Sequence, residues 1–330
     1  VGLDAIFFDD GLSGSILLDP SLGALQVTDG VSIIGPGAAT LTIDAQGNSR
    51  VIDFTSSDVD AVIEGLTITG GMTTGEGETG GGIRFQSAGT LTITDSVVTG
   101  NATLGNTAAG GGIHVSDGNL VVTGSTVSNN LTAGAASGGG GIWTAGDLTI
   151  SHSTLIGNRT RADSSTGGGL AAVGGTVSIL RSTIADNLTE GLGSVGGGVT
   201  LQGSSVTIRD STLSGNSTKN AGAQGGGIYA GIASVNVINS TISGNRAGSD
   251  SDLSGGGGIY ASAGVLNIDN STITANQATG TGGGIGTSTV GNATILTIEN
   301  SIVAGNVDDG SAPDFVAAGA IISPGAVRFS

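Results

Sequence analysis

The sequence has no cysteine among its 330 residues, which excludes disulfide bonds and thiolate metal sites. Basic residues are also scarce, because nine arginines and lysines stand against 26 acidic residues and leave a net charge of −17. So acidic a chain is a poor partner for nucleic acids and anionic membranes. Long hydrophobic runs are missing as well, and none approaches the roughly 20 residues of a membrane-spanning helix.

What the chain has in abundance is glycine, with 65 glycines beside 4 prolines. This content is typical of a disordered chain or of a repeat. Hydrophobic residues make up 37% of the sequence and the mean hydropathy is +0.27, which is enough to form a core and favours the repeat. The acidic residues are concentrated near the N-terminus. Residues 1–78 contain 12 acidic residues and one arginine, a net charge of −11.

A glycine run that ends in a branched apolar residue occurs eight times, at intervals of 26 to 31 residues. A phosphate-binding loop would need a following helix and a nearby lysine, whereas these runs are followed by the alternating pattern of a strand. The apolar residues that end the runs are Ile83, Ile113, Ile142, Leu170, Val199, Ile228, Ile259 and Ile285. The glycines therefore mark a corner that the chain turns repeatedly.

Each copy holds three short runs in which apolar and polar residues alternate, the period-two pattern of β-strands. Three strands in about 29 residues predict a parallel β-helix, in which each copy is one coil and pairs with the coils before and after it. A β-propeller is excluded because it needs four strands in a repeat of about 40–45 residues. We expect an all-β, single-stranded solenoid of about ten coils. Irregular acidic coils or a cap are predicted at 1–78, eight regular coils at 79–306, and a C-terminal cap or assembly tail at 307–330.

Two polar positions recur at fixed offsets in every copy. A serine follows the second strand, and the two residues before it predict a tight corner where Asn, Asp or Gly tolerates positive φ. An asparagine lies five residues beyond each serine and is expected to form a ladder of stacked side-chain amides. The ladder residues are Asn101, Asn130, Asn158, Asn187, Asn216, Asn245, Asn276 and Asn306.

Copies of the pattern "NSTISGN…GGGI", preceded by "IFFDDGLSGSILL", resemble bacterial right-handed parallel β-helix surface proteins with Gly/Asn/Thr-rich repeats. These proteins are related to the polymorphic outer-membrane and adhesin-like repeats. The resemblance covers nearly the whole chain, and it implies a right-handed β-helix that is exported to the cell surface or beyond. The broader fold also includes pectate-lyase-like enzymes, so the fold alone does not assign an activity.

The residue after each inward-facing apolar residue belongs to a predicted outward row along one sheet. All three Trp and Tyr residues of the chain lie in this row, where neighbouring coils would stack one ring on the next. Such a row suits sugar faces or a partner protein, and the alternative is a set of ordinary exposed strand residues. The row reads Arg84, His114, Trp143, Ala171, Thr200, Tyr229, Tyr260 and Gly286. The candidate ligand- or partner-binding residues are Arg84, His114, Trp143, Tyr229 and Tyr260.

No catalytic residue, metal or cofactor is predicted. Polysaccharide lyases of the broader fold commonly use a carboxylate cluster with calcium and a Lys or Arg base on this sheet, but the row contains no acid. His114 and His152 fall at different places in the coil and are not expected to pair. Asp163 and Glu190 could approach each other, within loops of unknown shape.

The leading hypothesis is a non-enzymatic extracellular structural or adhesive β-helix, extended to a subunit of a surface fibre assembled end to end. The expected partners are further copies of the chain, joined end to end or laterally, or cell-surface and matrix glycans. The alternative is a carbohydrate-binding or polysaccharide-degrading β-helix that uses the aromatic row. The expected location is extracellular or at the bacterial cell surface.

Overall fold

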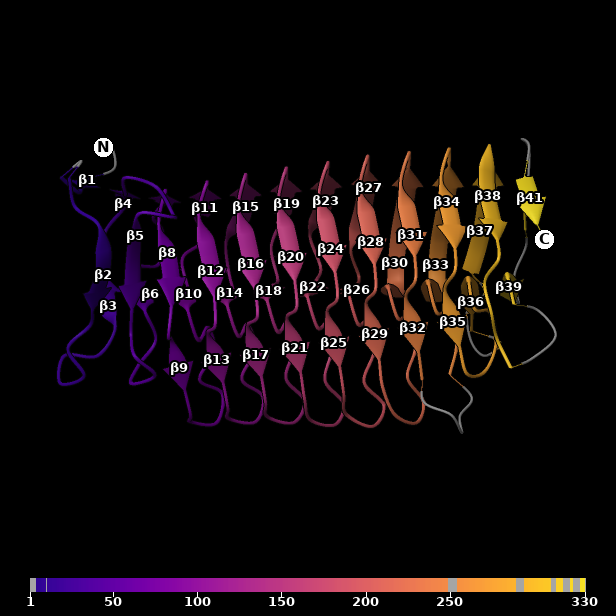
Figure 1. Cartoon of the computed structure of the whole chain (residues 1–330), viewed down its shortest axis with the longest axis horizontal. Helices are drawn as coiled ribbons and strands as arrows, with labels where there is room; N and C mark the ends of the chain where they lie inside the picture. The colour runs from indigo at the N-terminus through magenta and orange to yellow at the C-terminus, as the bar shows by residue number, and fades with distance from the viewer. Residues whose placement is uncertain are drawn as a thin grey trace.

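The computed structural model describes residues 4–9, 11–248, 254–288, 294–309, 313–316, 321–322 and 327–329. Over these residues the chain forms a rod of parallel β-strands in which every coil stacks on the next (Figure 1). The described residues contain no helix, and hence none long and apolar enough to cross a membrane. The predicted all-β parallel β-helix is therefore confirmed.

The first sheet has 21 strands and consists of two ladders that run side by side along the rod. One ladder contains β3 (Leu25–Val27), β6 (Ile52–Phe54), β10 (Ile83–Phe85), β14 (Ile113–Val115), β18 (Ile142–Thr144), β22 (Leu170–Val173), β26 (Val199–Gln202), β30 (Ile228–Ile238), β33 (Ile259–Asp269), β36 (Ile285–Thr287) and β39 (Phe315–Val316). The other contains β1 (Asp4–Phe7), β4 (Val31–Ile34), β7 (Ala61–Glu64), β11 (Thr90–Thr94), β15 (Asn119–Thr123), β19 (Leu148–Ser151), β23 (Thr176–Leu180), β27 (Ser205–Arg209), the later parts of β30 and β33, β37 (Thr294–Glu299) and β40 (Ile321–Ile322).

The second sheet has twelve strands and the third has eight. The second contains β2 (Gly14–Leu17), β5 (Leu41–Asp44), β8 (Thr67–Thr69), β12 (Val97–Thr99), β16 (Thr126–Ser128), β20 (Thr154–Ile156), β24 (Thr183–Ala185), β28 (Thr212–Ser214), β31 (Thr241–Ser243), β34 (Thr272–Thr274), β38 (Ser301–Ala304) and β41 (Val327–Phe329). The third contains β9 (Met72–Thr73), β13 (Ala102–Thr103), β17 (Leu131–Thr132), β21 (Arg159–Thr160), β25 (Leu188–Thr189), β29 (Ser217–Thr218), β32 (Arg246–Ala247) and β35 (Gln277–Ala278).

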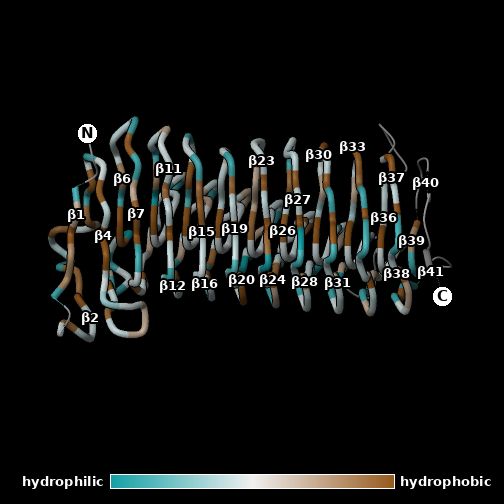
Figure 2. Tube along the Cα trace, turned by 90° about the horizontal axis from the view of Figure 1, so that it is seen from above, coloured by the Kyte–Doolittle hydropathy of each residue, from teal (hydrophilic) through white to brown (hydrophobic). Residues whose placement is uncertain are grey.

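The core is a continuous column of aliphatic side chains enclosed by the three sheets. Because the strands pair in register, each inward-facing Ile, Leu or Val lies on its equivalent in the next coil, as Ile83 does on Ile113. Figure 2 shows the hydrophobic stretches recurring from coil to coil along the rod. Burying one such side chain stabilises the fold by roughly 1.5–3 kcal/mol, so the repeated pattern supplies the main driving force for stacking.

The corner before each recurrent serine has the backbone geometry that the sequence predicts. The second corner residue has φ between 46° and 60° in all eight copies, a region in which Gly, Asn and Asp carry the least strain. These residues are Asp95, Gly124, His152, Arg181, Asp210, Asn239, Asn270 and Asn300. The corner directs the chain from the first sheet into the second.

The recurrent asparagines form the expected ladder inside the coil. The Nδ2 of Asn158 donates to Oδ1 of Asn187 at 3.0 Å, and the backbone N–H of Asn158 donates to the same oxygen at 2.9 Å. The pattern repeats along the rod until Asn306, whose amide donates to Oδ1 of Asp314 at 3.0 Å. Asp314 therefore accepts the last donors of the ladder in place of a further asparagine.

The first coils lack the third sheet, and this difference determines where the candidate functional site lies. Strands β1 to β6 belong to the first and second sheets, and the third sheet begins only at β9. At the other end, β39, β40 and β41 pair with β36, β37 and β38, so the described parts of 307–330 continue the same ladders.

Candidate functional site

The structure aligns the residues of the predicted outward row across eight successive coils. The strand register pairs Arg84 with His114, then His114 with Trp143, and continues in the same way through Tyr229 and Tyr260 to Gly286. The row thus exists as a geometric feature of the first sheet.

The aromatic residues of the row form two separate stacked pairs. The rings of His114 and Trp143 lie 4.6 Å apart and 6° from parallel, and those of Tyr229 and Tyr260 lie 5.9 Å apart and 4° from parallel. Stacking along the rod turns one face of each ring toward its partner. In-register strands thus place Tyr229 and Tyr260 one on the other, as the sequence predicts.

The positions between the two pairs are covered. Ala171 and Thr200 are each 1% exposed, and the Thr200 hydroxyl donates to the carbonyl oxygen of Val195 at 3.0 Å. Val195 belongs to a short parallel strip of bridges beside the row, which stacks Gly138, Thr166, Val195, Gln224, Gly255 and Thr281. This strip encloses the row on one side and closes the gap between the aromatic pairs.

The row continues toward the N-terminus beyond the point at which the sequence repeat begins. Asp53 pairs in register with Arg84, and Gln26 pairs with Asp53. The expectation that the row contains no acid is therefore wrong. No glycine run precedes the strand that contains Asp53, so aligning the repeats on their glycine runs leaves this coil out. The strands "IDF" at 52–54 and "IRF" at 83–85 nevertheless share the same alternation of apolar and polar residues.

Asp53 is the centre of a buried polar network. Its carboxylate accepts two hydrogen bonds from Arg84, from Nε and Nη2, both at 2.7 Å. Arg50 approaches with Nη1 at 3.4 Å, and Gln26 donates from Nε2 at 3.2 Å. The guanidinium of Arg50 also donates to the backbone carbonyls of Thr79 and Gly80. Both carboxylate oxygens of Asp53 thus accept hydrogen bonds.

The charges in this network fix its ionisation. Burial alone would raise the pKa of Asp53, but the hydrogen bonds from Arg84 and the positive charges of Arg50 and Arg84 outweigh it and hold that pKa below its ordinary value. Burial lowers the pKa of Arg50, and the charge of Arg84 lowers it further. The carboxylate is therefore ionised at neutral pH and held between two guanidinium groups.

His114 lies next in the row and is 6% exposed. Burial lowers its pKa to about 4, and the neighbouring charges of Arg84 and Arg50 act in the same direction. Its Nδ1 is buried and has no hydrogen-bond partner in the protein. The imidazole is therefore neutral at physiological pH, in contact with the ring of Trp143.

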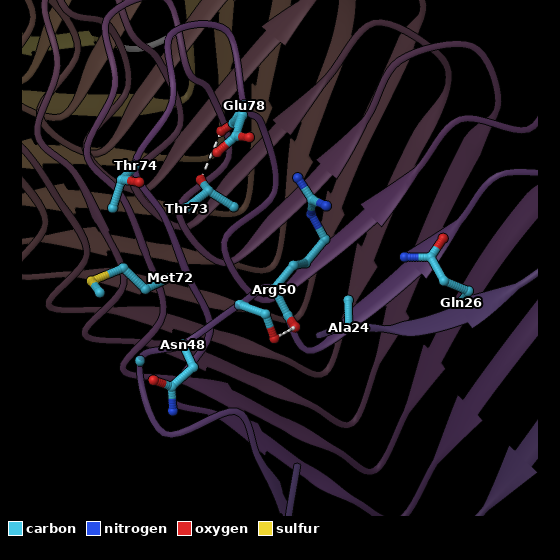
Figure 3. Close-up of a pocket in the computed structure, with 10 residues that line it drawn as sticks. Ala24, Gln26, Asn48, Arg50, Met72, Thr73, Thr74 and Glu78 are labelled. Carbon is cyan, nitrogen blue, oxygen red and sulfur yellow. Dashed lines mark hydrogen bonds between the residues drawn. The ribbon is translucent and has the colours of Figure 1, made fainter. Parts of the chain in front are cut away.

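A polar hollow of about 330 Å³ opens beside the network, where the third sheet begins. The tight turn at 47–49 of one coil faces β9 of the next coil, and this mismatch in coil shape leaves the space. Figure 3 shows Arg50 extending between Thr73 and Glu78 on one side and Gln26 on the other. The lining residues are Ala24, Gln26, Gly47, Asn48, Ser49, Arg50, Met72, Thr73, Thr74 and Glu78.

Other acids considered in the sequence are engaged separately. Glu190 forms ion pairs with Arg159 and Lys219, whereas Asp163 accepts a hydrogen bond from the backbone N–H of Leu192. His152 lies at an exposed corner away from His114. Over the residues that the structure describes, no three His, Asp or Glu side chains gather as a metal-binding group.

Comparison with known proteins agrees with the architecture. The model of the family described as "Right handed beta helix region" matches residues 28–223. No curated protein shows significant similarity. Among solved structures, the chain is similar to the A-module of mannuronan C-5 epimerase AlgE4 from Azotobacter vinelandii, with a TM-score of 0.53 and 16% identity over 96% of this chain and 91% of that one. At this identity the likeness shows a shared fold alone.

Proposed function

Because this chain belongs to the right-handed β-helix family, we propose that it is a non-enzymatic extracellular member that binds a polysaccharide at the hollow beside Arg50. The observation that carries the proposal is the lining of that hollow. Amides, hydroxyls, one guanidinium and one carboxylate converge there, and such groups match the hydroxyls of a sugar. The fold shared with a polysaccharide-modifying module supports this class of ligand.

The hollow also has the architecture of a preorganised site. Arg50 is 9% exposed and is fixed by bonds to two carbonyls and by the charge of Asp53. Gln26, Asn48 and Thr74 are exposed around it, and their remaining polar atoms offer hydrogen bonds to ligand hydroxyls. A rigid floor with a hydrated polar rim reduces the conformational entropy that is lost when a ligand binds.

The state of the charged residues supports a binding role without catalysis. A general base should be accessible and have a pKa near the working pH. Asp53 is fully engaged by two arginines, and His114 is almost completely buried with a pKa of about 4. Neither side chain is placed to take a proton from a bound sugar.

The test is binding to an array of neutral and uronate-containing glycans. We expect Gln26→Ala and Asn48→Ala each to weaken binding by roughly tenfold, the effect of losing about 1.4 kcal/mol of hydrogen bonding. Thr126→Ala, on the second sheet, should bind as the unchanged protein does. Loss of binding in Tyr229→Ala instead would move the site to the aromatic row, and binding to no glycan would refute the proposal.

Enzyme activity is tested on the same glycans. Unsaturated products or a changed ratio of uronate epimers, abolished by His114→Gln, would make the protein an enzyme and overturn the non-enzymatic proposal. His114 is the residue to change because its imidazole lies in one row with Asp53 and Arg84 on adjacent coils.

End-to-end assembly is a second candidate function, favoured by the N-terminal end of the rod. Strands β1 and β2 lie at sheet edges, where Phe7 of β1 is 70% exposed, and Leu22, in the turn after β2, is 82% exposed. An apolar strand edge of this kind is a template for pairing with another chain. Negative-stain microscopy should show fibres that Phe7→Asp and truncation of 313–330 each abolish. Monodisperse rods for the unchanged protein, or fibres that survive both changes, would refute assembly through the ends.

A further inference from the structure

A column of buried threonine hydroxyls runs through the third sheet, inside the loops that close each coil. In-register pairing stacks these threonines one per coil, and each is 0% exposed. The hydroxyl oxygens of four consecutive members have no hydrogen-bond partner in the protein. These are Thr132, Thr160, Thr189 and Thr218.

A second column of hydroxyls faces the first. The direction of the threonines is given by Thr103, whose Oγ1 donates to the carbonyl oxygen of Ala108, five residues on, at 3.0 Å. In the next three coils the residue five positions after the threonine is a serine (Ser137, Ser165 and Ser194), and in the coil of Thr218 it is Ala223. The Ser165 hydroxyl has no partner, and neither has that of Ser254, which the bridges at Gln224 and Gly255 place in the same column.

Six of the seven buried side-chain atoms without a partner among the described residues therefore belong to this one region. Leaving a buried hydroxyl unsatisfied costs roughly 1–3 kcal/mol, and more than nine in ten buried polar groups in proteins have a partner. Valine has nearly the shape of threonine and would fit the core without this cost. A hydroxyl present in four successive coils therefore favours a bound ligand that forms hydrogen bonds to it.

We propose that the two columns enclose a single file of ordered water molecules that runs from the coil of Thr132 to the coil of Thr218. Equivalent hydroxyl oxygens on adjacent coils repeat at roughly 4.8 Å, which is too far for a direct O–H···O bond of about 2.7–2.8 Å but less than twice that length. One water between two coils therefore reaches both hydroxyls. A buried water typically makes about three hydrogen bonds, and the facing serine or a loop carbonyl supplies the third.

The chemistry of the columns selects water over a cation. The two columns contain hydroxyls, main-chain carbonyls and methyl groups, and no charged side chain. A buried ion without a charged partner costs far more than a neutral molecule. The file also ends where the chemistry ends: Thr103 bonds directly to a carbonyl, and Ala247 and Ala278 replace threonine after Thr218.

The first test is a crystal structure at a resolution that shows ordered water. We expect one peak per coil interval between Thr132 and Thr218, within hydrogen-bond distance of the Thr160 and Thr189 hydroxyls. A loop interior with no peaks would overturn the proposal. Anomalous peaks at these places after soaking in rubidium chloride would identify a monovalent cation and overturn the assignment to water.

The second test is equilibrium unfolding in urea of Thr160→Val and Thr189→Val. If each hydroxyl bonds to water, each change should raise the unfolding equilibrium constant roughly five- to thirty-fold, the equivalent of one or two kcal/mol. The double variant should lose less than the sum, because both hydroxyls bond to the same molecule. Thr154→Val, which faces outward on β20, is the matched control and should change little.

The alternative predicts the opposite sign. If the hydroxyls are dry and unpaired, valine removes a buried polar group without loss of a bond, and both single variants should be more stable than the unchanged protein. Additive stabilisation by the two changes would therefore overturn the proposal. Thr103→Val provides the reference for losing one direct hydrogen bond of a buried threonine.

Discussion

Lowering the pH from 7 to 5 should cost the fold about 2 kcal/mol through a single imidazole, that of His114. The pKa of His114 is about 4 in the folded protein, against about 6.5 in an unfolded chain. The unfolded state therefore binds the proton more tightly. The stabilisation is fully present above pH 6.5 and is lost as the pH falls toward 4. A difference of about 2.5 pKa units corresponds to about 3.4 kcal/mol when fully developed, of which roughly 2 kcal/mol is lost by pH 5.

The physical cause is the place of the ring in the row. Protonation would put a positive charge on a 6% exposed imidazole that is already close to Arg84 and Arg50, with Asp117 as the one opposing charge. Urea unfolding at pH 7 and pH 5 measures the effect, and Trp143 is the natural probe because it is the single tryptophan and is stacked on His114. Titration of the His114 ring by NMR gives the folded pKa directly.

The matched variant is His114→Gln, which keeps a polar side chain but removes the titrating group. Its stability should change by less than 0.5 kcal/mol, roughly the scatter of independent sites, between pH 7 and pH 5. His152→Gln removes the other imidazole, at an exposed corner, and leaves the stacked pair intact. Equal losses of stability in His114→Gln and in the unchanged protein would show that the burial of His114 does not carry the pH dependence.

Three further changes test the parts that hold the rod together. Asn187→Ala removes an amide that accepts two hydrogen bonds and donates two inside the ladder. The free energy of unfolding in urea should therefore fall by at least about 3 kcal/mol. A decrease of less than about 1 kcal/mol would contradict the ladder's role. Gly141→Ala would place its Cβ 2.7 Å from a carbonyl oxygen of the next coil and should lower stability by about 1–3 kcal/mol by overpacking. A loss at Gly141 of less than 0.5 kcal/mol, roughly the change at an ordinary surface site, would contradict the close approach of the coils. Asp53→Asn leaves two arginines without their shared anion and should lower the free energy of unfolding by about 3 kcal/mol at pH 7, where the Asp53 carboxylate is ionised because its pKa is low. The difference in stability between the variant and the unchanged protein should shrink as the pH falls through that pKa. A difference that does not depend on pH would contradict the ion pairing.

The features that sequence reasoning predicts well are those that repeat. Each coil must match its neighbours, so the same spacing recurs in the chain wherever the same position recurs in the fold. The corner at Asp95, the ladder from Asn101 onward and the row through Arg84 are visible as fixed offsets for this reason. No helix-like period competes with the strand pattern, so the fold class follows from periodicity alone.

Sequence reasoning misses the features that depend on how deeply a side chain is buried or on an interruption of the repeat. The outward position of His114 follows from alternation, but its burial depends on packing around the row that no periodicity encodes. The pairing of Asp53 with Arg84 crosses into a coil that lacks the glycine signature. The hollow exists because β9 has no counterpart of its own sheet on the preceding coil, and such a mismatch has no local sequence signal.

The interruptions of the repeat near Arg50 and Asp53 are the physical basis of the proposed function. A purely structural coil gains most from aliphatic side chains, since replacing a buried ion pair by well-packed apolar residues is often neutral or stabilising. The chain nevertheless keeps Arg50 and Asp53 buried, at 9% and 3% exposure, beside a hollow that polar side chains line. Holding these charges in place costs free energy, and the result is a rigid set of donors and acceptors beside the hollow. That network lies where the third sheet begins, beside the hollow at which we propose that a polysaccharide binds.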